Sequence, residues 1–157
     1  WKPGCTWPGN DILRNRHGTP REALMTRYVI GPDVAVLLAE KRAVVHPKHK
    51  LLAPTLLRSQ VLAQLYGEVR RGALARKEAE RRLDHLRGLQ IRLLGDRVLQ
   101  RVAWDLADAL GWEDTFVAEY LALTKLQGDM LVVRDTVLRA AASKVVPTVA
   151  PEDAFFL

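Results

Sequence analysis

"MLVVRDTVL", residues 130–138, places four apolar residues directly before Arg134 and Asp135, and a helical pattern follows. The same order occurs in "YVIGPDVAVLL", residues 28–38, where a short β-rich run leads to Asp33. Apolar strands that alternate with helices are typical of a parallel sheet covered on both faces. Ligands of such sheets lie beyond the carboxyl ends of the strands, so both aspartates are expected at the functional edge.

The chain after Met25 continues this alternation of short apolar runs and helical patterns. We expect strands at 28–30, 50–54, 91–94, 130–133 and 145–149, and helices at 33–43, 56–72, 74–89, 96–111, 114–128 and 135–144. Asp96 and Gly111 are of the residue types that cap the start and the end of a helix. The sequence therefore predicts an α/β fold of three layers, α/β/α, around a mostly parallel central sheet of four to five strands.

The first 24 residues differ from the rest of the chain. They hold three of the eight prolines, three of the ten glycines and two of the four tryptophans, and they show no helical or strand period. We expect 1–24 to be an irregular N-terminal extension or leader and 25–157 to be one domain.

The composition of the chain limits which partners and which cellular compartment are expected. The formal net charge of +6, from 24 basic and 18 acidic residues, permits a polyanion such as nucleic acid but does not require one. The single cysteine, Cys5, excludes an intrachain disulfide and favours a reducing compartment. No apolar run approaches the roughly 20 residues that span a bilayer, and no signal-peptide core is visible. We expect a cytoplasmic protein without a membrane partner.

Two carboxylates at one sheet edge suggest a hard divalent cation, because Mg²⁺ takes oxygen ligands and keeps several waters. The alternative is that Asp33 and Asp135 each cap the helix that follows, a common role for a single aspartate. The pair favours the cation, since both residues follow apolar strands and Arg134, a non-capping residue, stands beside one of them.

Three blocks in order carry a resemblance. They are "YVIGPDVAVLLAE" (28–40), "LLAPTLLRSQVLAQLY" (51–66) and "TFVAEYLALTKLQGDMLVVRDTVL" (115–138). Together they resemble the PIN-domain family, in particular the VapC-like toxins of bacterial toxin–antitoxin pairs, over about 27–155. The resemblance implies a ribonuclease that hydrolyses RNA phosphodiester bonds with three or four acidic residues around Mg²⁺ or Mn²⁺.

The family's acidic positions are only partly matched. Asp33 and Asp135 match, but Gln60 stands at the glutamate of the S-E-V-L motif and Val117 at the aspartate of the T-Y-D-A motif. Gln60 keeps a carbonyl oxygen, whereas Val117 offers no ligand. Asp114 lies three residues before Val117, about 60° away on the same helix face, and is the candidate substitute; its other role is the helix cap. The resemblance thus implies Asp33, Asp135 and Asp114 as metal ligands, with Gln60 as a further catalytic residue.

The family usually forms homodimers and is inhibited by an antitoxin whose tail enters the acidic pocket. The resemblance therefore implies RNA, a cognate antitoxin and a second copy of the chain as partners. Arg14, Arg16 and Arg21 also permit a plug of the antitoxin type within the chain itself.

Two other functions remain open. One is a degenerate PIN domain that binds RNA or a protein without catalysis. The other is a phosphoacceptor receiver-like domain, for which 28–33 and 91–94 lack the required acids.

Several other features have a plainer interpretation. The histidines of "HPKHK" (46–50) are expected in a solvated loop, and His85 is expected to be exposed. The basic run in 70–82 is expected to be a solvated helix face, with contact to RNA as the alternative. Trp104 and Trp112 are expected in the core or at a dimer face.

Overall fold

The computed structural model describes residues 25–155, so the expected leader 1–24 lies outside the described residues. The strands are β1 (Thr26–Ile30), β2 (His49–Pro54), β3 (Arg92–Leu94), β4 (Met130–Val132) and β5 (Thr148–Val149). The helices are α2 (Pro32–Glu40), α3 (Leu57–Arg70), α4 (Arg76–Gly88), α5 (Arg97–Leu110), α6 (Phe116–Leu126), α7 (Thr136–Ala142) and α8 (Pro151–Phe155). All strand pairs are parallel, and their order in the sheet is β3-β2-β1-β4-β5.

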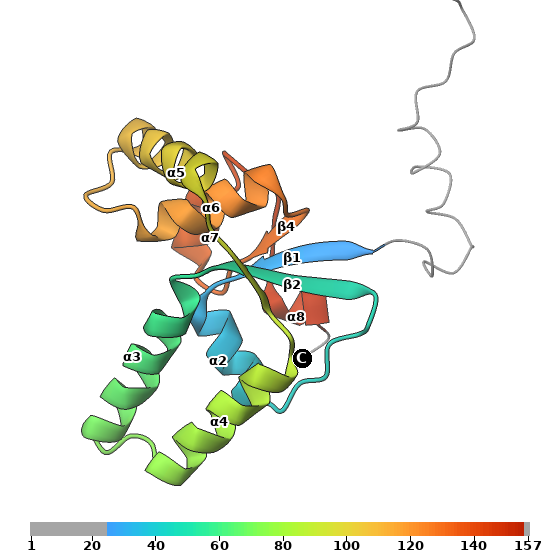
Figure 1. Ribbon diagram of the computed structural model, residues 1–157, viewed down its shortest axis with the longest axis vertical. Coiled ribbons are helices and arrows are strands. Elements are labelled where there is room, and N and C mark those ends of the chain that lie inside the picture. The colour runs from blue at the N-terminus through green and yellow to red at the C-terminus, as the bar shows by residue number, and fades with distance from the viewer. Residues whose placement is uncertain (1–24, 156–157) are drawn as a thin grey trace, which may run out of the picture.

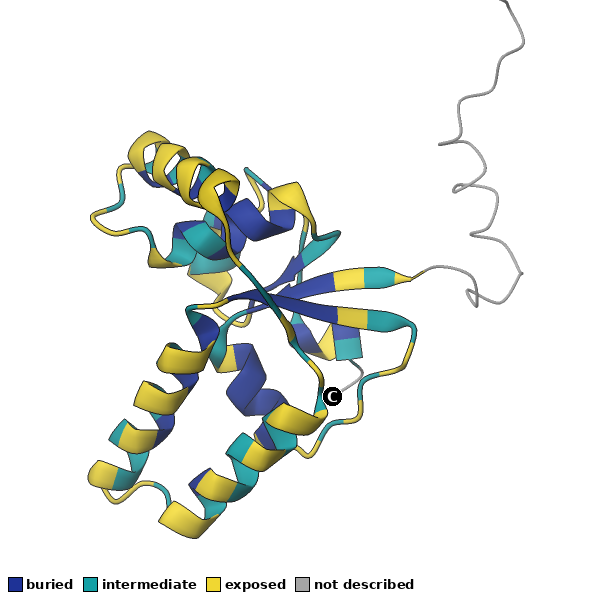
Figure 2. Ribbon diagram, in the orientation of Figure 1, coloured by how far each residue is buried: buried dark blue, intermediate teal, exposed yellow. Residues whose placement is uncertain are grey.

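Helices cover both faces of this sheet, which confirms the predicted three-layer α/β/α fold (Figure 1). Helices α5 and α6 pack together on one side, and α2, α3 and α4 form a second group on the other. The central strands and the helix surfaces that face them are buried, whereas α3, α4 and α5 expose their outer faces (Figure 2). No helix among residues 25–155 has the length and apolar character needed to cross a membrane.

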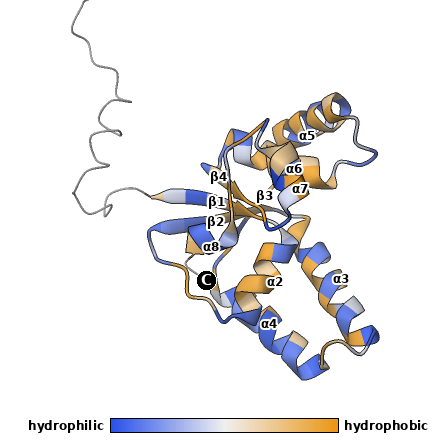
Figure 3. Cartoon of the chain, turned by 180° about the vertical axis from the view of Figure 1, so that it is seen from behind, coloured by the Kyte–Doolittle hydropathy of each residue, from blue (hydrophilic) through white to orange (hydrophobic). Residues whose placement is uncertain are grey.

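Helix α2 is the central element of its layer. Six consecutive residues from Val34 to Ala39 are buried, because the helix lies between the sheet and the pair α3 and α4. Figure 3 shows α2 as mainly hydrophobic and α4 as mainly hydrophilic. A helix that is apolar all round is stable only when it is covered on all sides, and α2 meets this condition.

The predicted caps of α5 are confirmed. Asp96 accepts a hydrogen bond from the N–H of Leu99 at 2.8 Å, and Gly111 ends the helix in the left-handed region with φ of 69°. A residue with a Cβ would be strained in this conformation, which explains why glycine occupies the position.

The last strand was predicted too long. Val145 and Val146 donate their N–H groups to Ala142, so they extend the end of α7 instead of pairing with β4. Strand β5 is therefore restricted to Thr148–Val149. Helix α8 was not predicted, although Pro151 at its first position is a typical helix start.

Some side-chain environments also differ from expectation. His85 is not fully exposed, since its Nε2 lies 3.0 Å from the carbonyl oxygen of Ala43. His49 is half-buried and belongs to β2, whereas His46 is exposed in the preceding loop as expected. Trp104 lies outside the core with 68% of its surface exposed, and Trp112 packs partly against the core.

Candidate functional site

The two aspartates lie at the carboxyl ends of neighbouring strands. Strands β1 and β4 pair directly, with Ile30 opposite Val132 at their ends. Asp33 follows in the first turn of α2, and Asp135 is the N-cap residue of α7. The parallel arrangement that the sequence predicted therefore brings both carboxylates to one edge of the sheet.

The aspartates line one hollow with two parts. The outer part has a volume of about 630 Å³ and the inner part about 160 Å³. The two parts share Asp33, Val117, Asp135 and Leu138. Apolar residues at the end of β4, Leu131 to Val133, form part of the inner wall. The hollow is thus a largely apolar cleft with four exposed carboxylates in its lining, those of Asp33, Glu113, Asp114 and Asp135.

The helix-cap alternative holds for one aspartate only. Asp135 accepts a hydrogen bond from the N–H of Leu138 at 2.9 Å through Oδ1, so it does cap α7. In α2 the N-cap is Gly31, and Asp33 stands two residues further on without a side-chain cap bond. Its carboxylate still interacts favourably with the positive end of the helix dipole. Asp33 therefore has no capping role that would account for its place in the hollow.

Gln60 reaches the inner hollow from α3 and meets Tyr120 of α6. The Tyr120 hydroxyl donates a hydrogen bond of 2.6 Å to Oε1 of Gln60. Burial raises the pKa of Tyr120, and the negative charges of Glu119 and Asp33 raise it further, so the hydroxyl stays protonated. One lone pair of the Gln60 carbonyl oxygen is thus engaged, and its NH₂ group and the second lone pair are left for other partners.

Val117 and Asp114 lie on the α6 side of the hollow. Val117 lines both parts and contributes only apolar surface. Asp114 lines the outer part, where its Oδ1 accepts a hydrogen bond of 3.1 Å from the N–H of Phe116. Asp114 therefore forms a turn just before α6, whose N-cap residue is Thr115, and its carboxylate remains at the rim. Among residues 25–155, no group of three or more His, Cys, Asp or Glu side chains is placed to hold a metal ion.

Comparison with known proteins supports the fold. No protein-family model matches the chain, and no curated protein matches it. Among solved structures, the chain is similar to the crystal structure of PAE2754 from Pyrobaculum aerophilum, with 22% sequence identity and a TM-score of 0.59. The similarity covers 78% of this chain and 90% of that one. At this identity the likeness shows the fold alone.

Two residues of the hollow were not assigned a role from the sequence. Tyr120 follows Val117 by three residues, so helical spacing alone places both on one face of α6. Arg134 is exposed and lines the inner hollow beside Asp135. It supplies a positive charge next to two carboxylates, a combination suited to a phosphate that is bound together with a cation.

Proposed function

We propose that this chain is a PIN-like, VapC-like ribonuclease that hydrolyses RNA phosphodiester bonds with Mg²⁺ or Mn²⁺. The observation that supports this function is the placement of Asp33 and Asp135 in one hollow at the carboxyl ends of two paired strands. That position is where open α/β sheets bind their ligands.

The donor set fits a sparse metal site. Asp33 contributes a carboxylate without a cap bond, and Asp135 contributes the oxygen that does not accept from Leu138. Magnesium is commonly held by one or two carboxylates, several waters and the phosphates of its substrate. When bound, such an ion supplies hydroxide from water and stabilises negative charge on the phosphate.

Neighbouring side chains complete the recognition of a phosphodiester. The NH₂ group of Gln60 donates to a phosphate oxygen, because the hydrogen bond from Tyr120 turns the carbonyl oxygen toward α6 and leaves the NH₂ group for the ligand. Arg134 places a guanidinium at the same hollow and binds a second phosphate oxygen. Asp114 lines the outer part of the same hollow, from which it would contribute through bridging water.

Calorimetric titration with Mn²⁺ and Mg²⁺ tests the metal site. Asparagine is as good an N-cap as aspartate, so Asp135→Asn removes the charge while it keeps the cap of α7. We expect sub-millimolar binding by the unmodified chain and its loss in Asp135→Asn. The matched control is Asp96→Asn, which makes the same change at the cap of α5 and is expected to bind as before. No binding up to several millimolar would overturn the proposed nuclease.

A second candidate is a degenerate PIN domain that binds RNA or a protein without catalysis. With Val117 and Gln60 in place of acids, only Asp33 and Asp135 remain of the three or four acidic positions that the family uses. Val137, with 79% of its surface exposed, and Trp112 give the outer hollow an apolar rim suited to a protein partner. RNA binding that persists without divalent cations and without cleavage would favour this candidate.

We extend the first proposal to the partners that the family resemblance implies. They are a cognate antitoxin, whose tail enters the hollow, and a second copy of the chain, for which the exposed Trp104 on α5 is a contact residue. We place the protein in the cytoplasm.

The proposed plug with Arg14, Arg16 and Arg21 concerns residues outside the described part, and cleavage that rises when 1–24 is removed would support it. Light scattering of the purified chain separates monomer from dimer.

A further inference from the structure

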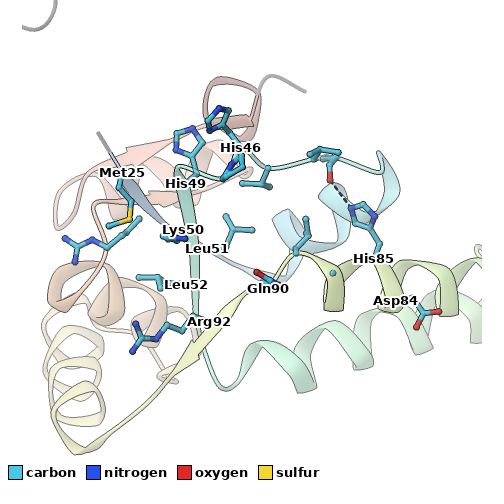
Figure 4. A pocket seen from close by; sticks show the side chains of 17 residues that line it. Met25, His46, His49, Lys50, Leu51, Leu52, Asp84, His85, Gln90 and Arg92 are labelled. Carbon is cyan, nitrogen blue, oxygen red and sulfur yellow. Dashed lines mark hydrogen bonds between the residues drawn. The ribbon is translucent and has the colours of Figure 1, made fainter. Parts of the chain in front are cut away.

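A second cavity lies at the opposite edge of the sheet from Asp33 and Asp135. Its volume is about 940 Å³, and it is lined by the amino ends of β1, β2 and β3 together with two walls, 43–47 and 84–90. Figure 4 shows His46 and His49 at one end of this cavity and Arg92 at the other, with Lys50 between them. None of its lining residues belongs to the hollow of the proposed nuclease site.

The cavity exists because β3 is shorter than β2. Strand β1 pairs with β2 from His49 to Leu52, but β3 pairs with β2 only from Leu52 onward. Within 25–155, the edge of β2 before Leu52 therefore has no strand beside it. The walls are joined by the contact between His85 Nε2 and the carbonyl oxygen of Ala43 at 3.0 Å, drawn as a dashed line in Figure 4.

Positive charge gathers on one face of this open edge. Arg27 lies opposite Lys50, and Arg92 lies opposite Leu52, two residues after Lys50. Residues two apart in a strand point to the same face, so these three cations form a row about 10 Å long. Asp129 neutralises Arg27 through two side-chain hydrogen bonds.

Lys50 and Arg92 are left as available charges. Both are exposed, and neither forms a salt bridge with any residue of the described chain. The one acidic residue of the lining is Asp84, which is bonded to Arg87 and points largely to solvent. The cavity thus has two long cationic side chains, Lys50 and Arg92, that are not paired with the acidic residue of its lining.

The other face of the edge supplies apolar and ring surfaces. His49 and Leu51 point away from Lys50, and the rings of His46 and His49 lie 6.0 Å apart in an edge-to-face arrangement. Burial lowers the pKa of His49, and His46 and Lys48 lower it further, so its ring is neutral near pH 7. Charge recognition therefore depends on Lys50 and Arg92, and the rings contribute contact surface.

We propose that this cavity binds a nucleotide, with its phosphate at Lys50 and Arg92 and its base reaching around the open edge of β2 to the exposed ring of His46. A cavity of this volume is in the range of small-molecule sites. Paired cations beside ring surfaces suit a ligand with an anionic end and a flat apolar end.

The shared chemistry is a terminal phosphate on a nucleoside, which either a free nucleotide or the end of an RNA chain can provide. Calorimetric titration of the full chain with adenosine monophosphate, adenosine and inorganic phosphate measures the contribution of each part. A short oligoribonucleotide with and without a terminal phosphate forms the second arm. Tight binding of the monophosphate indicates a free nucleotide, whereas preference for the phosphorylated oligomer indicates an RNA end.

The test variant is Lys50→Gln combined with Arg92→Gln, which keeps both stems and removes both charges. We expect binding of the phosphorylated probe to weaken about tenfold or more, because each lost contact is a charge-assisted hydrogen bond. The control combines Lys125→Gln with Arg101→Gln, two exposed positions on α6 and α5, and is expected to bind as the unmodified chain does.

Three outcomes would overturn the proposal: no binding of any phosphorylated probe at millimolar concentration, equal loss in the control, or binding of an acidic peptide in place of the nucleotides. Asp135→Asn, the variant that tests the proposed metal site, lies at the other edge and is expected to leave the binding of adenosine monophosphate, titrated without divalent cations, unchanged. The two proposals can therefore fail separately.

Discussion

The hydroxyl of Tyr120 donates a hydrogen bond of 2.6 Å to Oε1 of Gln60, although 60 residues separate the two in the chain. This bond joins α6 to α3 across the inner hollow and orients the amide of Gln60. Its oxygen faces Tyr120, and its NH₂ group is free to face a ligand. The orientation of the Gln60 amide is thus set by a neighbour on another helix.

Replacing Tyr120 by Phe is expected to release the carbonyl oxygen of Gln60. Metal affinity should rise, by about twofold or more, because a third oxygen becomes available beside Asp33 and Asp135. The lost hydrogen bond is expected to lower the free energy of unfolding by about 1 kcal/mol. Titration with Mn²⁺ and urea unfolding measure the two effects. Tyr66→Phe, at an exposed position on α3, is the control and should change neither.

Adding two acidic side chains is expected to strengthen the proposed metal site. Gln60→Glu combined with Val117→Asp adds two carboxylates to a hollow that already holds Asp33 and Asp135. We expect divalent-ion affinity to rise at least about tenfold, since each added charge attracts the cation. Gln64→Glu adds a charge one turn further along α3 and should have no such effect. Unchanged affinity in the double variant would show that the hollow is not a metal site.

We expect Glu78 to contribute to the free energy of unfolding in a way that depends on pH. The hydrogen bond from Arg81 lowers its pKa to about 2, with Arg82 acting in the same direction. A carboxyl with a lowered folded-state pKa stabilises the fold above its unfolded value, 4.5, and loses this contribution as the pH falls toward 2. Glu78→Gln should therefore be less stable than the unmodified chain near neutral pH and equally stable near pH 2.

Urea unfolding at several pH values measures this difference. Glu80→Gln is the control, because Glu80 pairs with Arg76 in a far more exposed position on the same helix. A stability difference for Glu78→Gln that stayed constant from neutral to strongly acidic pH would contradict the assignment.

Gly128 leaves no room for a side chain between α6 and β4. An added Cβ would lie 2.7 Å from Cγ2 of the buried Val29 and 3.1 Å from the backbone Cα of Thr124. Gly128→Ala is expected to lower the free energy of unfolding by about 1–3 kcal/mol, because backbone and core must move. Gly88→Ala at the end of α4 meets no atom within 4 Å and is expected to be neutral or slightly stabilising. Thermal unfolding compares the two.

Local pattern was sufficient for the order of the elements and for the carboxyl-edge position of Asp33 and Asp135. Apolar runs and helical periods are properties of neighbouring residues, and an α/β alternation admits few arrangements besides a covered parallel sheet. The caps Asp96 and Gly111 were predictable for the same reason, since each acts within one turn of its own helix. Helix α8 was missed because its five residues are too few to show a period.

Tertiary structure alone decided what the side chains do. The engagement of Gln60 by Tyr120 and the row formed by Lys50 and Arg92 depend on helix packing and strand register, which join residues distant in the chain. The open edge of β2 likewise depends on where β3 begins to pair with it. The amino-acid sequence of β3 does not show where this pairing begins. Short-range patterns specify which segments are buried, but the distance and direction between two side chains are set by the packing of the whole domain.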